Sequence, residues 1–199
     1  LGRVGLYLSV LVLISPAILF FLWMISLSLK NEADNTAFPP VFIPNPPTIA
    51  NFVDVFQKND FLSYTINSII VSFSATGLAL LFGVPAGYGI AKAKATKAAV
   101  LILVARITPG LSYLIPLFLL FQWLGLIGTL TPLVITHLVI TVPIVVWIMI
   151  GFFEGLPGEL EEAALVDGAT IWQAFRHVAM PLARPGIMVA MILSFIFSW

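Results

Sequence analysis

The sequence predicts an all-α membrane protein, a bundle of helices that crosses the bilayer several times. Of its 199 residues, 60% are apolar and 9% are charged, whereas soluble domains carry about 25% charged residues. Several uncharged stretches reach the roughly 20 residues that cross a hydrocarbon core. Positive charges gather in alternate connections between these stretches, which is typical of multi-pass proteins.

The first two predicted spans are residues 4–29 and 61–91, which contain no charged side chain. Residues 98–153 carry a single charge, Arg106, and are too long for one crossing. The turn-rich residues 125–132 therefore divide this stretch into spans three and four.

Residues 185–199 form the start of a fifth predicted span. We expect the natural sequence to continue beyond Trp199 with the rest of this span, an outer loop and a sixth span. The prediction for residues 1–199 is a single transmembrane domain. It has an extracytoplasmic loop at 30–60 and a cytoplasmic loop at 154–184.

The distribution of lysine and arginine predicts a cytoplasmic amino terminus, because cytoplasmic loops retain positive charge during insertion. With this orientation two positive residues lie outside, Lys30 and Lys58. Those inside are Arg3, Lys92, Lys94, Lys97, Arg176 and Arg184.

The outer loop at 30–60 is rich in proline, which forces extended or turning backbone. Thr48 can cap a short helix whose apolar residues Phe52, Val55 and Phe56 recur at helical spacing. This helix could lie on the membrane surface, meet a partner outside the membrane or pack on the chain's own spans.

Charge returns between spans four and five, at residues 154–184, where two short helices are predicted. Pro157 suits a helix start, and the acids that follow it lie where the helix dipole favours negative charge. Gly168 suits the end of this first helix, because glycine adopts the left-handed conformation without a steric clash. The first helix has an apolar face of Leu160, Ala163 and Ala164.

A second helix is predicted to begin at once, since Thr170 and Gln173 have the spacing of a capping box. Its apolar residues recur at steps of three and four, and Pro181 should stop or kink it. They are Ile171, Trp172, Phe175, Val178 and Ala179. Such a projecting helical pair could fit a groove in another protein, or it could lie on the lipid headgroups.

This segment resembles the cytoplasmic signature of the permease subunits of binding-protein-dependent ATP-binding-cassette importers, specifically the maltose-type carbohydrate permeases. The signature is E-A-A, three residues, G, nine residues, I, one residue and L-P. The matching positions are Glu162, Ala163, Ala164, Gly168, Val178, Met180 and Pro181, with Val and Met as apolar departures.

The resemblance extends over the whole chain, in short phrases at and between the predicted spans. These are Asn67-Ser68-Ile69, Gly87-Tyr88 with Lys92, Ile115-Pro116-Leu117 with Phe121, and Gly151-Phe152-Phe153 before Leu156-Pro157.

The resemblance implies that the helix at about 170–179 inserts into a cleft of a cytoplasmic ATPase dimer. Glu162 would supply a polar contact, Ala163 and Ala164 would permit close packing, and Gly168 would supply the turn. The remaining residues assigned to ATPase coupling are Thr170, Trp172, Phe175 and Pro181.

It also implies a bacterial inner-membrane permease that is not itself an enzyme and binds no cofactor. ATP-Mg would be bound and hydrolysed by the partner ATPase. The other partners would be a second, related permease, an extracytoplasmic solute-binding protein and membrane lipid. The solute would be a carbohydrate, with a polyamine, a phosphate or another small solute as the alternative.

Transport by alternating access requires a pathway and flexible spans. Pro109 with Gly110, Pro116, Pro132 and Pro143 are candidate kinks. Arg106 faces the pathway or subunit interface, or reaches back to the cytoplasmic surface. The other pathway candidates are Tyr113, Gln122, Trp123, His137 and Trp147.

Composition argues against other classes of protein. The sequence has no cysteine and two histidines, so it offers no disulfide and little support for a metal centre. It contains no basic tract suited to nucleic acid. An ion-driven transporter would carry acidic groups inside its spans, and an intramembrane enzyme would need a catalytic cluster; neither feature is present in this sequence.

Overall fold

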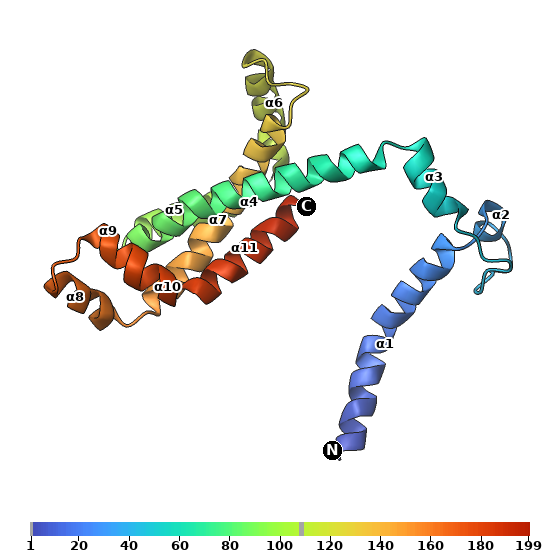
Figure 1. Cartoon of the computed structure of the whole chain (residues 1–199), viewed down its shortest axis with the longest axis horizontal. Coiled ribbons are helices and arrows are strands. Elements are labelled where there is room, and N and C mark those ends of the chain that lie inside the picture. Colours follow the sequence, from blue (N-terminus) through green and yellow to red (C-terminus); the bar gives the residue numbers. More distant parts are fainter. Residues whose placement is uncertain (1, 108–109) are drawn as a thin grey trace. The chain divides into compact units, whose positions relative to one another are not determined.

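The computed structural model describes residues 2–107 and 110–199, with the side chains of 105–111 outside the description. Every regular element in these ranges is a helix (Figure 1). The chain divides into two compact units, Leu1–Thr65 and Ile66–Trp199, and each is described by itself. The all-α prediction is confirmed, whereas the prediction of a single domain stays a prediction.

The first unit contains α1 (Arg3–Ser28), α2 (Glu32–Asn35), α3 (Ala50–Lys58) and the start of α4 (Phe61–Lys92). Helix α1 matches the first predicted span and buries none of its residues within the chain. Thr48 accepts a hydrogen bond from the Ala50 amide at 3.1 Å, but the N-cap of α3 is Ile49, one residue after the predicted threonine cap.

The second unit is a bundle built on α4, α7 (Thr131–Glu154) and α11 (Arg184–Ser198). Helices α4 and α7 are long and apolar enough to span a membrane. They approach closely because Gly83 and Gly87, one helical turn apart, face α7. A Cβ atom at Gly83 would lie 2.6 Å from Val145 Cγ1, and one at Gly87 would lie 2.7 Å from Met149 Cβ. Small residues permit such contact between helices in membranes.

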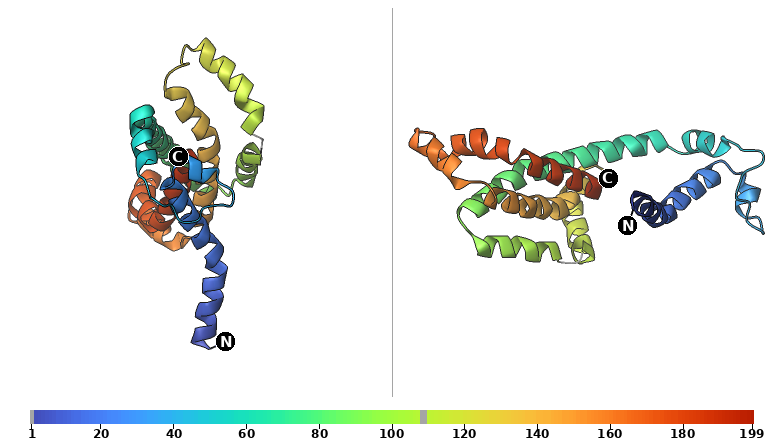
Figure 2. Two further views of the ribbon diagram at one scale, coloured as in Figure 1. Left: turned by 90° about the vertical axis from the view of Figure 1, so that its right-hand side faces the viewer. Right: turned by 90° about the horizontal axis from the view of Figure 1, so that it is seen from below.

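Helix α11 packs against both partners through a row of small residues spaced four apart. Gly186 lies directly against the ring of Phe152 on α7, where a Cβ atom would clash. The Ser72 hydroxyl of α4 donates to the Ser198 carbonyl oxygen at 2.8 Å. Figures 1 and 2 show the three helices side by side in different views.

The described part of the third predicted span contains α5 (Thr96–Ile107), η1 (Gly110–Tyr113) and α6 (Leu114–Trp123). None of these described helices is long enough to cross a membrane. Of the predicted kink at Pro109 with Gly110, Pro109 lies outside the described residues and Gly110 begins η1. Helix α6 ends at the predicted turn, where Gly125 and Gly128 have positive φ angles of 67° and 89°.

The fourth predicted span is α7, with Pro132 in its first turn and Pro143 inside it. The fifth predicted span, α11, follows a helical segment at 171–182. Together these two pieces are apolar enough for a broken span, and they are bent by 76° at a break at Ala183. Within residues 2–107 and 110–199, three helices therefore qualify as spans, and a fourth if the bent pair counts as one.

Candidate functional site

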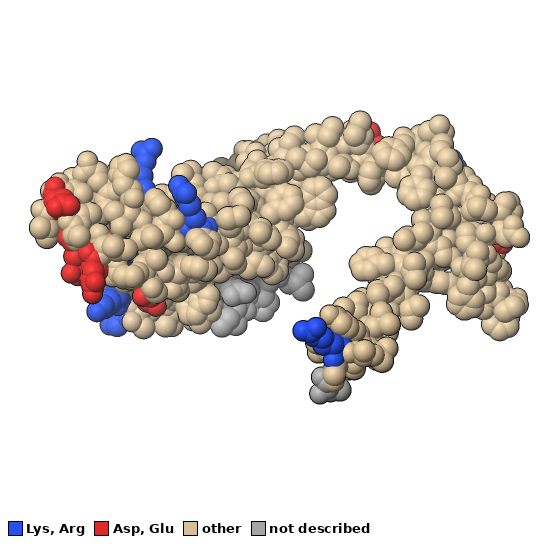
Figure 3. All heavy atoms as spheres, turned by 60° about the horizontal axis from the view of Figure 1, so that its bottom comes forward, with Lys and Arg blue, Asp and Glu red and all other residues tan. Residues whose placement is uncertain are grey.

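The segment between α7 and α11 folds as two helices at the end of the bundle where α4 and α7 finish (Figure 1). Helix α8 (Gly158–Val166) begins after Pro157 and has Glu159 and Glu161 in its first turn. Their carboxylates complement the positive end of the helix dipole. Figure 3 shows acidic and basic side chains gathered around this end, while the adjoining flank of the bundle carries few.

The turn after α8 is built as the sequence predicted. Gly168 has a φ of +91°, a conformation that side-chain-bearing residues rarely adopt. Thr170 then caps α9 (Ile171–Ala174): its hydroxyl accepts from the Gln173 amide at 3.3 Å, and Gln173 Oε1 accepts from the Thr170 amide at 2.7 Å. This reciprocal pair is a complete capping box.

The helical segment continues through η2 (Phe175–Ala179), which is one π-helical stretch, into α10 (Met180–Leu182). Pro181 cannot donate a hydrogen bond to the carbonyl of His177, and its ring crowds that carbonyl. A widened turn relieves this conflict, and such turns are frequent at functional sites. Pro181 was predicted to stop or kink this helix, and the helical segment ends at Leu182 with a bend of 76° at Ala183.

Glu161 anchors α8 to the end of α4. Its side chain is 5% exposed, and its Oε2 accepts a hydrogen bond from the Tyr88 hydroxyl at 2.7 Å. The same oxygen lies 3.0 Å from Lys92 Nζ. A buried carboxylate is costly unless it is hydrogen-bonded and paired, and both conditions are met here.

Tyr88 is the centre of this junction, because its ring touches two further elements. It makes an edge-to-face contact with Phe153 of α7 at 5.2 Å between centroids, and it lies 4.7 Å from Phe175 of η2. One tyrosine thus joins α4, α7, α8 and η2. We name Tyr88, Lys92, Phe153, Glu161 and Phe175 the junction cluster.

Apolar side chains on both sides of the turn between α8 and α9 are exposed. Val166 is 87% exposed, and beyond the turn Ile171 and Trp172 are 69% and 61% exposed. We name these three residues the apolar tip. Ile171 and Trp172 also border an open cavity of about 610 Å³ against α4, together with Pro85 and Gly89. The tip is a surface that a partner could cover.

The eight residues predicted for ATPase coupling fall into different environments. Glu162, Ala163, Gly168, Thr170 and Trp172 are exposed, whereas Ala164 and Pro181 are half-buried. Phe175 is 2% exposed and packs inside the chain's own core. It therefore attaches the segment to the bundle and is not available to a partner.

The expected apolar face of α8 differs from the observed one. Leu160 is 47% exposed, and the buried residue of α8 is Glu161. The position of Glu161 in the first turn predicted only a favourable interaction with the helix dipole, and the junction cluster was not predicted. Tyr88 and Lys92 lie four residues apart at the end of a predicted span, a spacing that indicates a shared polar partner. That partner, Glu161, lies about 70 residues further along the chain.

The predicted pathway residues are spread over several elements. Gln122 and Trp123 are exposed at the end of α6, and His137 is half-buried in α7. Tyr113 is half-buried in η1. Trp147 borders a cavity of about 610 Å³ with Phe152 and Val189. The side chain of Arg106 lies outside the described residues, and the pathway role of all six stays a prediction.

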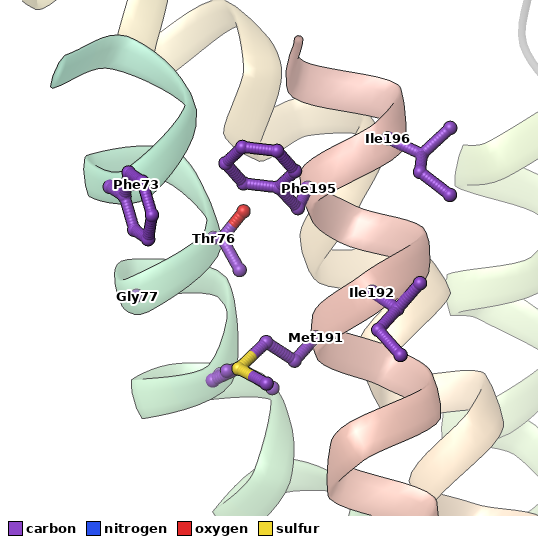
Figure 4. A pocket seen from close by; sticks show the side chains of 8 residues that line it. Phe73, Thr76, Gly77, Met191, Ile192, Phe195 and Ile196 are labelled. Atoms are coloured by element: carbon purple, nitrogen blue, oxygen red, sulfur yellow. The ribbon is translucent and has the colours of Figure 1, made fainter. Parts of the chain in front are cut away.

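A further cavity of about 320 Å³ lies between α4 and α11 (Figure 4). Phe73, Gly77, Met191, Phe195 and other apolar residues form its wall. Thr76 also lines it, and its buried hydroxyl has no hydrogen-bond partner in the described part of the chain.

The fold and this site define a class: a multi-pass helical membrane protein with two short helices, joined by a tight turn, between two of its spans. A family model described as "Binding-protein-dependent transport system inner membrane component" matches residues 79–199. The chain belongs to this family of membrane transport components.

Two characterised relatives agree with this assignment. The trehalose transport system permease protein SugB of Mycobacterium tuberculosis is 36% identical over 203 residues, covering 100% of this chain and 73% of the relative. The sulfoquinovosyl glycerol transport system permease protein SmoH of Agrobacterium fabrum is 33% identical over 181 residues. That match covers 89% of this chain and 64% of the relative, so the chain spans about two thirds of the length of such proteins.

A solved structure supports the fold independently. A chain of a bacterial ABC transporter involved in the import of the acidic polysaccharide alginate superimposes with a TM-score of 0.75 at 23% identity. The match covers 100% of this chain and 69% of that chain.

Proposed function

We propose that this chain forms part of the translocation pathway of an ATP-driven importer, and that residues 154–184 are its docking element for a cytoplasmic ATPase. The observation that carries the proposal is the combination of an exposed apolar tip with a junction cluster in which Lys92 is exposed and the other four side chains are buried. A docking element needs an exposed surface that binds the partner. It also needs close contacts with the spans that it moves.

The junction cluster supports a route for that movement. A force on α8 would act on α4 through the Glu161 contacts with Tyr88 and Lys92. A force on η2 would act on α4 and α7 through the ring of Phe175. The bend at Ala183 would carry the same displacement into α11. Alternating access then requires two arrangements of these helices, with ATP biasing one of them.

The proposed partners follow from the family. ATP-Mg would be bound and hydrolysed by a dimeric ATPase, and a second permease, different from this one, would complete the pathway. An extracytoplasmic binding protein would deliver the solute. The amino terminus would be cytoplasmic, since this orientation places 154–184 on the side of the ATPase.

We propose a carbohydrate as the solute, because relatives of this chain carry the names of trehalose, sulfoquinovosyl glycerol and diacetylchitobiose transport systems. Radiolabelled uptake into proteoliposomes that contain the assembled importer tests this proposal. Binding protein loaded with sugar should stimulate ATP hydrolysis, and polyamine or phosphate should not. If ATP hydrolysis were stimulated by polyamine or phosphate and not by sugar, the choice of carbohydrate would be contradicted.

The docking role is tested by comparing two glycines of the same segment. Gly168→Ala forces a side chain into the left-handed region, at a cost of about 1–2 kcal/mol, which should distort the turn between α8 and α9. Gly158→Ala is the matched control, because its Cβ would meet only Glu162 Oε1 at 3.9 Å. We expect about a tenfold loss of coupled uptake for Gly168→Ala and normal uptake for the control. Equal uptake by both variants, with equal membrane insertion, would contradict the role of the turn.

A further inference from the structure

Helix α3 is attached to the end of α1 through its polar side. The Asn51 side-chain amide donates to the carbonyl oxygens of Ser28 at 3.0 Å and Lys30 at 2.8 Å. The Thr48 amide donates to the Leu29 carbonyl at 2.8 Å just before the helix. The amino-terminal end of α3 is therefore fixed where α1 ends.

The other end of α3 is fixed where α4 begins. Two residues, Asn59 and Asp60, separate it from Phe61, so the Cα atoms of Lys58 and Phe61 are about 11 Å apart at most in extended chain. The rings of Phe56 and Phe61 meet edge to face at 5.3 Å. Since α1 and α4 both qualify as membrane spans, both ends of α3 lie at the level where spans enter and leave the bilayer.

The apolar side of α3 is largely exposed within its own unit, apart from the contact of Phe56 with Phe61. Ile49, Phe52, Val53 and Phe56, spaced as one helical face, are 67%, 50%, 39% and 62% exposed. Asn51, which binds the Ser28 and Lys30 carbonyls, lies on the polar side of α3. The apolar face therefore points away from the end of α1. On the polar side Lys58 Nζ also lies 2.6 Å from Asp54 Oδ2, one turn earlier.

We propose that α3 lies flat in the headgroup region of the bilayer, with this apolar face turned toward the acyl chains. Four observations favour lipid as the occupant: amphipathic spacing, fixation at both ends beside spans, aromatic residues at the boundary, and α1 as a neighbour with an equally exposed apolar surface. The charges of α3 are paired with each other, so apolar burial and not attraction to anionic lipid drives the insertion.

The absence of cysteine in this chain permits a direct test. Nitroxide labels are attached to single cysteines in the intact permease, reconstituted in phosphatidylcholine vesicles. Phe56→Cys reports the apolar face, and Gln57→Cys on the polar side is its neighbouring control. At position 56 we expect oxygen to collide with the nitroxide more often than a water-soluble nickel chelate does. At position 57 we expect the nickel chelate to collide with the nitroxide more often than oxygen does.

Three outcomes would overturn the proposal. In the first, the label at position 56 is as accessible to the nickel chelate as the label at position 57. In the second, when the solute-binding protein is added to the vesicles, the label at position 56 becomes shielded from both reagents, and removing that protein reverses the shielding, which would make the face a protein contact. In the third, insertion occurs only when anionic lipid is added, which would make charge its cause.

Discussion

Close packing between α4 and α7 depends on single glycines. At Gly87 a Cβ atom would lie 2.7 Å from Met149 Cβ and 3.2 Å from the Val146 carbonyl oxygen. Neither neighbour is the free end of a flexible side chain, so the two helices would have to separate. Gly89, two residues away on the same helix, has open space at the corresponding point.

We therefore predict opposite effects for two alanine substitutions. Gly87→Ala should destabilise the permease by about 1–3 kcal/mol through overpacking. Gly89→Ala should be neutral or slightly stabilising, because alanine favours the helix by about 0.5–1 kcal/mol. Thermal unfolding in detergent, followed by tryptophan fluorescence, measures both effects. Equal melting temperatures for the two variants would contradict the observed contact between α4 and α7.

The hydroxyl of Tyr88 should matter separately from its ring. Tyr88→Phe keeps the contacts with Phe153 and Phe175 but removes a hydrogen bond from the buried carboxylate of Glu161. Hydrogen bonds to charged groups contribute about 1.5–3 kcal/mol, so α8 should open more often.

Hydrogen exchange of the α8 amides measures that opening, with exchange about tenfold faster or more expected in Tyr88→Phe. Tyr64→Phe is the control, because Tyr64 is 63% exposed and lies outside the junction cluster. Unchanged exchange in both variants would show that Lys92 alone holds Glu161.

At the scale of elements, much of the 154–184 segment was predictable because its determinants are local. The turn follows from Gly168, and the start of α9 follows from two residues three positions apart, Thr170 and Gln173. Helix α8 starts after Pro157 for equally local reasons.

The parts that were missed depend on distant residues. Glu161 is buried because Tyr88 and Lys92 lie beneath it, which no local pattern in α8 reveals. Phe175 fits an apolar face whether that face meets a partner or the chain's own core, and the structure places it in the core. The third predicted span met the length criterion, but length does not detect the change from η1 to α6 at Leu114.

The capping box gives a prediction at this scale. Thr170→Ala removes the acceptor of the Gln173 amide and should destabilise the start of α9 by about 1 kcal/mol. Amides 171–174 should then exchange about fivefold faster, while the core of α4 is unaffected. Thr170→Ser retains the oxygen and should exchange like the native protein, so faster exchange in Thr170→Ser would indicate that the methyl group matters instead.

At the scale of the molecule, the proposed function requires that the ends of the bundle differ. The end with α8 and α9 carries the apolar tip, and acidic and basic side chains gather around it (Figure 3). The first unit carries α3, which sits between two candidate spans.

Docking on the ATPase is tested by cross-linking from the apolar tip. The intact permease receives one cysteine, Val166→Cys or, as a control in the 30–60 loop, Asn59→Cys, and is assembled with its ATPase, second permease and binding protein. A short thiol-to-amine cross-linker should join position 166 to the ATPase in a nucleotide-dependent manner and should not join position 59 to it. Failure of position 166 to cross-link in an assembly that hydrolyses ATP and transports its solute would contradict the docking role of this segment.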